Sequence, residues 1–217
     1  MQKEQLLKQY FGYDTFRDGQ EPLMDNLLNG NDCIGVMPTG AGKSLCFQIP
    51  ALLFEGITLV VSPLISLMKD QVQALVASGV AAAYINSSLS VSQTAKVFNN
   101  ARKGLYKIIY IAPERLDVPE FQDFAQNAKI SMVTIDEAHC VSQWGQDFRP
   151  SYLKINKFID KLPKRPVISA FTATATSEVR EDIIKILKLN NPFIMATGFN
   201  RENLYFEVQK PENKYKA

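Results

Sequence analysis

The sequence predicts an α/β fold with a mostly parallel, doubly wound sheet and helices on both of its faces. Two observations lead to this prediction. Short apolar runs alternate with helical stretches along the chain, as in stacked βα units. β-branched residues are frequent in most of these runs, which is typical of parallel strands buried on both faces. The expected strands are Cys33–Met37, Ile57–Ser62, Ala82–Ile85, Lys107–Ile111, Ser131–Ile135 and Pro166–Phe171.

Turn residues and apolar spacing predict the helices between these strands. Proline in a first turn and glycine just after a last turn mark helix boundaries. Ser90 with Gln93 three residues later forms a capping-box pattern, which satisfies two backbone N–H groups at a helix start. The expected helices cover residues 23–28 with Pro22 and Gly30 as boundaries, an apolar segment after Ser44, Pro63 to about Ala77 with Gly79 beyond, Ser90 to near Gly104, and Glu178–Leu187.

The composition excludes several classes of protein. The chain has 217 residues, 46% of them apolar, and a net charge of +2, so it is not disordered as a whole. No apolar run approaches the roughly 20 residues that span a bilayer, and the N-terminus lacks a signal peptide's apolar region. Three cysteines with no close pair and one histidine fit neither a disulfide framework nor a zinc site. We therefore expect a soluble protein of a reducing compartment with no membrane partner.

A glycine-rich loop between the first strand and an apolar helix predicts a phosphate site. Gly40 and Gly42 allow successive N–H groups to curl around a phosphate at a helix N-terminus. Lys43 would reach the β- and γ-phosphates, and the Ser44 hydroxyl would bind Mg²⁺. The general pattern has glycine where this chain has Met37, and the alternative is a glycine-rich turn with a solvated lysine. The residues expected around the nucleotide's phosphates are Thr39, Gly40, Ala41, Gly42, Lys43 and Ser44.

An acidic pair follows the strand expected at residues 131–135. Asp136 would hold Mg²⁺, and Glu137 would orient or deprotonate the attacking water, with Lys43 as the third catalytic residue. Alone, such a pair is usually a solvated loop, but a phosphate loop on the same sheet favours catalysis. His139 is either a structural hydrogen-bonding residue or, as we expect, a coupling residue between the nucleotide site and its neighbours.

Together these segments resemble the first RecA-like motor domain of superfamily 2 helicases, and most closely the RecQ family of DNA helicases. Met37 matches the Met-Pro-Thr-Gly start that is usual in this family. The tryptophan-containing loop directly after the acidic pair is the most diagnostic segment. The matching segments, in chain order, are FGYDTFRDGQ (11–20), MPTGAGKS (37–44), SPLISLMKDQ (62–71), IAPERL (111–116), DEAHC (136–140), SQWGQDFRP (142–150) and FTATAT (171–176).

The resemblance implies an adenine-recognition motif in the N-terminal segment. Gln20 carries an amide whose donor and acceptor match the N6–H₂ and N7 edges of adenine. Tyr13 and Arg17 supply a π face and a planar cation suited to sandwiching the base. Alternatively, Phe11, Tyr13 and Phe16 pack this segment on the domain. We expect both, with Phe16 packing and Gln20 contacting the base.

The loop after the acidic pair interleaves aromatic and basic residues. Trp144, Phe148 and Arg149 suit stacking on single-stranded bases and contact with phosphates, and the resemblance implies that this loop senses single-stranded DNA. The alternative is that Trp144 is a buried anchor. The other residues expected on the DNA side are Ser62, Lys69 and Arg115 as phosphate contacts, with a plain solvated charge as the alternative for Lys69 and Arg115, and Thr172, Thr174 and His139 as links to the ATP site.

The resemblance covers nearly the whole chain but only part of the family's architecture. We expect residues 1–20 to hold the adenine motif, 21–197 to form the first lobe, and 198–217 to lead toward an absent second lobe. In the intact protein the family implies ATP-driven, 3′-to-5′ unwinding of DNA, with single-stranded and duplex DNA as partners, in DNA repair and recombination. ATP and Mg²⁺ are the expected cofactors, and no zinc is expected in this part.

For the chain alone we expect weak Mg-ATP binding and little turnover. The reason is that the second lobe supplies an arginine worth about 10³–10⁵ in rate. The alternatives are an RNA helicase lobe of the same superfamily and a catalytically silent, nucleotide-gated interaction module. We expect the protein in the nucleoid-containing cytoplasm if it is bacterial and in the nucleus if it is eukaryotic.

Overall fold

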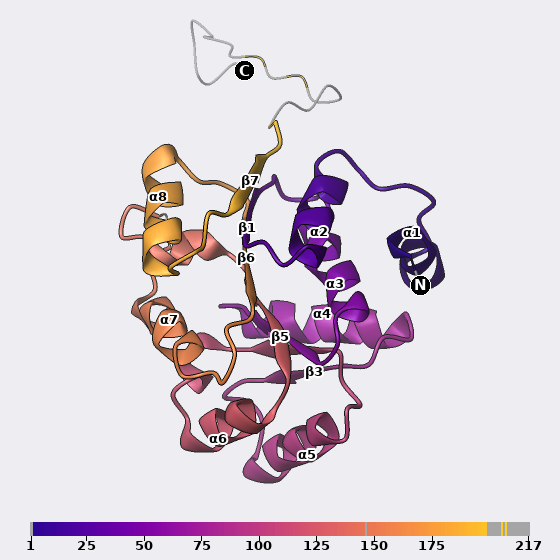
Figure 1. The fold of residues 1–217 in the computed structure, drawn as a ribbon, viewed down its shortest axis with the longest axis vertical. Helices are drawn as coiled ribbons and strands as arrows, with labels where there is room; N and C mark the ends of the chain where they lie inside the picture. Colours follow the sequence, from indigo (N-terminus) through magenta and orange to yellow (C-terminus); the bar gives the residue numbers. More distant parts are fainter. Residues whose placement is uncertain (1, 146, 199–204, 206, 208–217) are drawn as a thin grey trace, which may run out of the picture.

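Seven strands form the centre of the protein, in the order β3-β4-β2-β5-β6-β1-β7 (Figure 1). This computed structural model describes residues 2–145, 147–198, 205 and 207. Every strand pairing among them is parallel, which confirms the predicted doubly wound sheet. The strands are β1 (Cys33–Val36), β2 (Ile57–Val61), β3 (Ala82–Ile85), β4 (Ile108–Ile111), β5 (Ile130–Ile135), β6 (Val167–Thr172) and β7 (Phe193–Ala196).

Helices cover both faces of this sheet, as the sequence predicts (Figure 1). The helices α2, α3 and α4 lie against one face, and α5, α6, α7 and α8 lie against the other. A short π-helical turn, Leu7–Phe11, follows the first helix. The helices are α1 (Lys3–Leu6), α2 (Gln20–Leu28), α3 (Lys43–Leu53), α4 (Ile65–Ala77), α5 (Val91–Arg102), α6 (Pro119–Asn127), α7 (Lys154–Ile159) and α8 (Ser177–Ile186).

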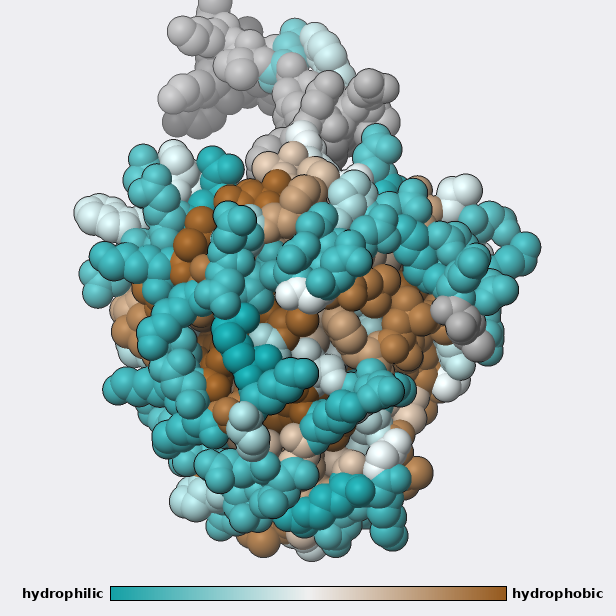
Figure 2. All heavy atoms as spheres, in the orientation of Figure 1, coloured by the Kyte–Doolittle hydropathy of each residue, from teal (hydrophilic) through white to brown (hydrophobic). Residues whose placement is uncertain are grey.

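Two apolar layers, one on each face, hold the helices to the sheet. On the α5–α8 side, phenylalanine rings from three helices meet: the ring centroids of Phe98 and Phe124 lie 5.0 Å apart, and those of Phe121 and Phe158 lie 5.5 Å apart. Polar residues cover most of the surface in Figure 2, where apolar residues are visible mainly in the hollows between them. Because the strands are buried on both faces of the sheet, the end of each apolar run sets where its strand ends. It also sets where the following loop at the carboxyl edge begins.

The structure differs from the predicted elements in a few places. α4 begins at Ile65 rather than at Pro63, because Leu64 is extended and the Pro63 carbonyl accepts a hydrogen bond from the Arg149 guanidinium at 3.0 Å. The strand β7 and the helices α1, α6 and α7 are absent from the prediction. α6 does carry recognisable signals, with Pro119 in its first turn and buried residues at helical spacing. β7 is only four residues long and lies at the sheet edge, so its pattern is weak.

A buried carboxylate at the amino-terminal edge joins three strands. Asp32, whose side chain is 1% exposed, pairs with Arg165 at 2.6 Å. The same carboxylate accepts hydrogen bonds from the backbone N–H groups of Ile168 at 2.9 Å and Asn190 at 2.7 Å, and its own carbonyl accepts one from Phe193 at 2.8 Å. Asp32 therefore aligns the starts of β1, β6 and β7.

No described helix is both long and apolar enough to cross a membrane. Of the predicted connecting segment 198–217, only residues 198, 205 and 207 belong to the part of the chain that the structure describes.

Replacing Asp32 by Ala should lower the free energy of unfolding by about 3 kcal/mol, because the change leaves Arg165 and buried N–H groups without their acceptor. A matched control is Asp160→Ala, since Asp160 forms an exposed ion pair with Lys188. The control should lose less than about 1 kcal/mol. Urea denaturation measures both values. Equal losses would contradict the role of Asp32.

Candidate nucleotide site and the adjoining aromatic loop

A cavity of about 380 Å³ lies at the carboxyl edge of the sheet, where parallel sheets bind their ligands. Its volume suits a small ligand of the size of a nucleotide. Every residue predicted for the nucleotide site or for catalysis lines it except Ala41. The lining residues are Tyr13, Thr15, Arg17, Gln20, Thr39, Gly40, Gly42, Lys43, Ser44, Leu45, Phe47, Leu67, Gln71, Tyr110, Asp136 and Glu137.

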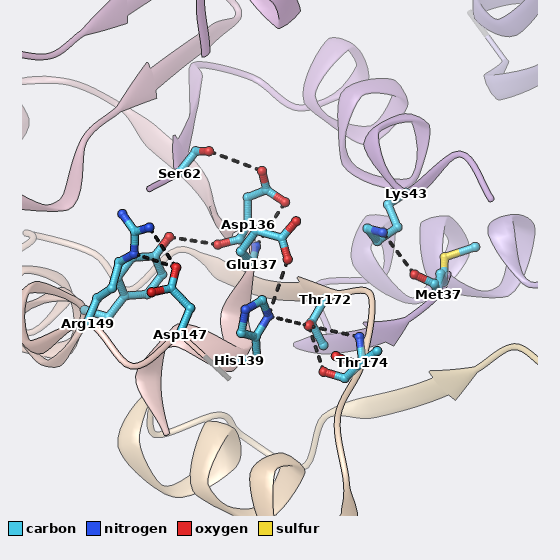
Figure 3. Close-up of polar contacts among 11 residues, drawn as sticks. Met37, Lys43, Ser62, Asp136, Glu137, His139, Asp147, Arg149, Thr172 and Thr174 are labelled. Carbon is cyan, nitrogen blue, oxygen red and sulfur yellow. Dashed lines mark hydrogen bonds and ion pairs between the residues drawn. The ribbon is translucent and has the colours of Figure 1, made fainter. Parts of the chain in front are cut away.

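The loop between β1 and α3 has the backbone that a phosphate cradle requires. Gly40 and Gly42 both take positive φ angles, 86° and 82°, which glycine adopts without strain. The Lys43 ammonium folds back on the loop and donates to the Met37 carbonyl at 3.0 Å (Figure 3). The lysine thus lies where the phosphates of a nucleotide would lie, and it can exchange this carbonyl for them.

The N-terminal segment binds this loop directly. Gln20 is 1% exposed; its Oε1 accepts the Arg17 N–H at 2.9 Å, and its Nε2 donates to the Gly42 carbonyl at 3.1 Å. The Arg17 guanidinium donates to the Gly40 carbonyl. The Gln20 Nε2 also donates to the Ala41 carbonyl at 3.3 Å, so both of its N–H bonds are used and donation to adenine would require an exchange. The Oε1 atom accepts only one hydrogen bond and keeps a second lone pair for an adenine N–H. Tyr13, 51% exposed, lies at the mouth of the cavity.

Packing of the N-terminal segment is also observed. Phe11 and Phe16 are partly buried against an apolar cluster that includes Leu6 and Ile49. The structure thus shows the packing role that the sequence predicts for Phe16.

Asp136 lies at the end of β5, close to the phosphate loop. Its Oδ2 accepts the Ser62 hydroxyl at 3.2 Å, its Oδ1 accepts the Glu137 N–H at 3.0 Å, and its backbone carbonyl accepts the Tyr152 hydroxyl at 2.9 Å. Burial, followed by repulsion from the Glu137 carboxylate, raises the pKa of Asp136 to about 6. A cation bound near Asp136 would offset the free-energy cost of keeping this carboxylate charged.

The residues present fit Mg²⁺ bound together with a nucleotide. Asp136 supplies one carboxylate and Ser44 one hydroxyl at the same cavity. Among the described residues no group of three or more acidic, histidine or cysteine side chains could hold a metal by itself. That donor set suits Mg²⁺, which is usually held by one or two carboxylates together with substrate phosphates and water.

The predicted phosphate contacts lie in different environments. Ser62 is fully buried and its hydroxyl is used by Asp136, so a contact between Ser62 and a DNA phosphate, as predicted, is not available in this structure (Figure 3). Lys69 is half-buried in α4 and forms no ion pair with any described residue. Arg115 is half-buried, and its Nε has no hydrogen-bond partner among the described residues.

His139 connects the acidic pair to the end of β6. Its Nδ1 lies 2.8 Å from the Thr172 hydroxyl and 3.3 Å from the Glu137 carboxylate (Figure 3). The Thr172 hydroxyl donates its only proton to the Thr174 carbonyl at 3.0 Å, so it accepts a hydrogen bond from His139. The geometry therefore assigns the proton to Nδ1, which can interact with both oxygens.

The aromatic loop presents its tryptophan to solvent. Trp144 is 80% exposed, so the alternative of a buried anchor is wrong. Arg149 donates to the Asp147 carboxylate at 2.7 Å (Figure 3). It also donates to the Pro63 carbonyl at 3.0 Å, which ties the loop to the start of α4. Gly145 lies so close to the His139 carbonyl that a Cβ there would clash with it.

Comparisons with known proteins agree with this geometry. A family model described as DEAD/DEAH box helicase matches residues 17–183.

This chain belongs to the DEAD/DEAH box helicase family.

Within this family, the chain corresponds to the first motor domain of RecQ helicases. It is 52% identical over 214 residues to the ATP-dependent DNA helicase RecQ of Bacillus subtilis, covering 97% of this chain and 36% of that protein. It is 45% identical to the RecQ of Haemophilus influenzae, covering 97% of this chain and 33% of that protein. The chain thus spans about a third of the length of these curated relatives.

Solved structures support a RecA-like helicase fold. The DUF1998 helicase MrfA bound to DNA superposes with a TM-score of 0.69 at 17% identity, covering 90% of this chain and 29% of that one. A hypothetical ATP-dependent RNA helicase from Sulfolobus tokodaii superposes with a TM-score of 0.67 at 21% identity, covering 88% of this chain and 56% of that one.

The helicase site also contains residues that are absent from the sequence prediction. The Gln48 Nε2 donates to the side-chain Oε1 of Gln71 at 3.1 Å and to the Tyr110 hydroxyl at 3.2 Å, and both Gln71 and Tyr110 line the cavity. Gln48 follows Ser44 by four residues in α3, so helical spacing could have placed it on the same face. Gln71 and Tyr110 come from separate elements, and no local signal marks them.

In the metal-free helicase lobe, Asp136→Asn should raise the free energy of unfolding at pH 7 by about 1–3 kcal/mol. The amide oxygen can accept the Glu137 N–H and the amide nitrogen can donate to the Ser62 hydroxyl, which reverses that bond, but the side chain carries no charge. The folded carboxyl holds its proton up to about pH 6, whereas the unfolded one releases it near 3.8. The loss of stability caused by the buried charge of Asp136 is therefore absent below about pH 4, grows between pH 4 and 6, and is constant above pH 6.

Urea denaturation of both proteins in EDTA, at pH 4 and pH 7, measures this difference. A gain in stability that is the same at both pH values would contradict the assigned cause.

Proposed function

We propose that this chain is the ATP-binding lobe of an ATP-dependent DNA helicase that unwinds DNA in the 3′-to-5′ direction. The observation that carries the proposal is the convergence of Lys43, Ser44, Asp136 and Glu137 on one cavity, with His139 linking them toward an exposed aromatic loop. The relatives from Bacillus subtilis and Haemophilus influenzae are named ATP-dependent DNA helicases, which supports DNA as the substrate.

Phosphate binding would use the loop between β1 and α3. Its backbone N–H groups and the Lys43 ammonium would surround the β- and γ-phosphates, and Lys43 would exchange the Met37 carbonyl for phosphate oxygens. Ser44 and Asp136 would hold Mg²⁺, which supplies positive charge to the phosphate oxygens. Gln20 and Arg17 already donate to carbonyl groups of this loop. They would therefore couple the binding of adenine to the conformation of the loop.

Hydrolysis would use Glu137 as the base. The carboxylate would accept a proton from water as the water oxygen bonds to the γ-phosphorus and the bridging P–O bond to ADP breaks. His139 donates toward this carboxylate, so it would orient Glu137. The same Nδ1 lies within hydrogen-bond distance of the Thr172 hydroxyl. The position of β6 and the orientation of the Glu137 carboxylate would therefore be coupled.

The chain alone would bind Mg-ATP weakly and turn it over slowly. In the proposed mechanism a second RecA-like lobe supplies the arginine that stabilises charge in the transition state, worth about 10³–10⁵ in rate. These two relatives are each about three times as long as this chain. We infer that the intact protein acts in DNA repair and recombination, in the nucleoid-containing cytoplasm of a bacterium or in the nucleus of a eukaryote.

Glu137→Gln in the longer, two-lobed protein should lower ATP hydrolysis by about 10²–10⁴-fold and leave nucleotide affinity unchanged, because only the base is lost. Lys43→Ala is the matched comparison and should weaken nucleotide binding itself. Phosphate release and titration with a fluorescent ATP analogue measure the two quantities. Unchanged hydrolysis in Glu137→Gln would contradict the assigned base.

Trp144→Ala should weaken the affinity for single-stranded DNA about tenfold or more, because a base loses its stacking surface. Stimulation of ATP hydrolysis by DNA should fall with it, whereas ATP affinity should not. Leu153→Ala, which removes another exposed apolar side chain, is the control. Equal loss of DNA stimulation and ATP affinity would argue against a DNA role for Trp144.

Strand separation on matched DNA and RNA duplexes tests the choice of DNA.

A further inference from the structure

The segment that presents Trp144 is held at both of its ends. The 3₁₀ turn η3 (Ala138–Val141) follows the acidic pair directly. At its start, His139 contacts Thr172 at the end of β6 at 2.8 Å (Figure 3). At its end, the Ser142 hydroxyl donates to the Asp182 carboxylate of α8 at 2.6 Å. Forty residues of sequence separate the partners of this second contact.

Ser142 also determines the direction of the loop that follows. The residue is fully buried, and its hydroxyl oxygen accepts the Trp144 N–H at 3.1 Å. Its backbone carbonyl accepts the Gly145 N–H at 3.0 Å. A hydroxyl has only one proton to donate, so the bond to Asp182 turns the oxygen lone pairs toward Trp144.

The helix that carries Asp182 is itself fixed beside η3. Thr176 caps its first turn by accepting the Val179 N–H at 3.3 Å, just beyond the end of β6. Val179 and Ile183 pack in the same buried cluster as Val141 of η3. Asp182 therefore has a defined position from which to hold Ser142.

We propose that Asp182 is a positioning residue of the aromatic loop, and that through the Ser142 hydroxyl it holds Trp144 in the orientation that binds single-stranded DNA. This inference rests on the proposed function, because it takes Trp144 as a DNA contact. Asp182 does not line the nucleotide cavity, and it acts on the loop through its bond to Ser142. A carboxylate acceptor makes this bond shorter and stronger than a bond between neutral groups.

Charge alone predicts the opposite effect on DNA binding. A carboxylate near a DNA-contacting loop repels phosphates, so its removal would strengthen binding if Asp182 acted only through its charge. If Asp182 acts by positioning, its removal weakens binding. The sign of the change therefore separates the two roles.

The fluorescence of Trp144 gives a direct readout, because it is the only tryptophan in the chain. In the 217-residue protein without DNA, Asp182→Ala and Ser142→Ala should each lower the steady-state anisotropy of Trp144. Ser142→Ala should lower it at least as much, because it removes both the bond to Asp182 and the acceptor of the Trp144 N–H. The double variant should match Ser142→Ala, since Asp182 acts only through that hydroxyl. Asp182→Asn keeps an acceptor and should retain most of the anisotropy. Glu181→Ala removes an exposed neighbouring charge and should change nothing.

Titration with an oligo(dT) of about 15 nucleotides gives the second readout. Asp182→Ala should bind at least about threefold more weakly than the unchanged protein, and Asp182→Asn less than about twofold more weakly. Affinity for a fluorescent ATP analogue should be the same in all variants, which also shows that they are folded.

An unchanged anisotropy in Asp182→Ala, or oligonucleotide binding as tight as or tighter than before, would overturn the proposal. If oligo(dT) left the fluorescence of the unchanged protein and every variant unaffected, the DNA role of the loop in the proposed function would fail. The anisotropy values in the same samples would then still decide whether Asp182 holds the loop.

Discussion

Glu137 takes a left-handed backbone conformation, with φ and ψ both 48°, directly after the central strand β5 ends. For a residue other than glycine this conformation costs on the order of 1–3 kcal/mol and persists only where the surroundings impose it. Here they do: Asp136 Oδ1 accepts the Glu137 N–H, the Glu137 carbonyl accepts the Cys140 N–H at 2.9 Å, and the Tyr152 hydroxyl binds the Asp136 carbonyl. The turn keeps Asp136 beside the phosphate loop and directs the chain toward β6.

The consequence of this turn is that one short segment serves two sites. Asp136 and Glu137 line the nucleotide cavity, and within a few residues the chain reaches Trp144 in solvent. His139 joins the segment to β6, and Ser142 joins it to α8. A displacement of Glu137 by a bound nucleotide would therefore reach the loop through hydrogen bonds and packed elements that are already in place. The small net charge of +2 is compatible with this arrangement, since only a narrow strip of loops would meet DNA.

Local pattern was sufficient for the sheet and for the residues at its carboxyl edge. Apolar runs, most of them rich in β-branched residues, mark β1 to β6. Parallel pairing places the carboxyl ends of β1 and β5 at the same edge, on either side of β6, and Lys43 and Asp136 line one cavity there. The direction of individual side chains was not predictable in this way. Ser62 faces inward to Asp136, and the Gln20 amide is used by the phosphate loop. These contacts, like the bond between Ser142 and Asp182, depend on tertiary packing between distant segments.

The most direct test of the link between the two sites follows the fluorescence of Trp144 while Mg²⁺ and a non-hydrolysable ATP analogue are added to the protein. If the acidic pair and the loop are joined through His139 and Thr172, bound analogue changes the emission of Trp144. Thr172→Val keeps the shape of the side chain but removes the hydroxyl that His139 contacts, so it should abolish this change while the analogue still binds. An identical change in Thr172→Val, or none in the unchanged protein with analogue bound, would contradict the link.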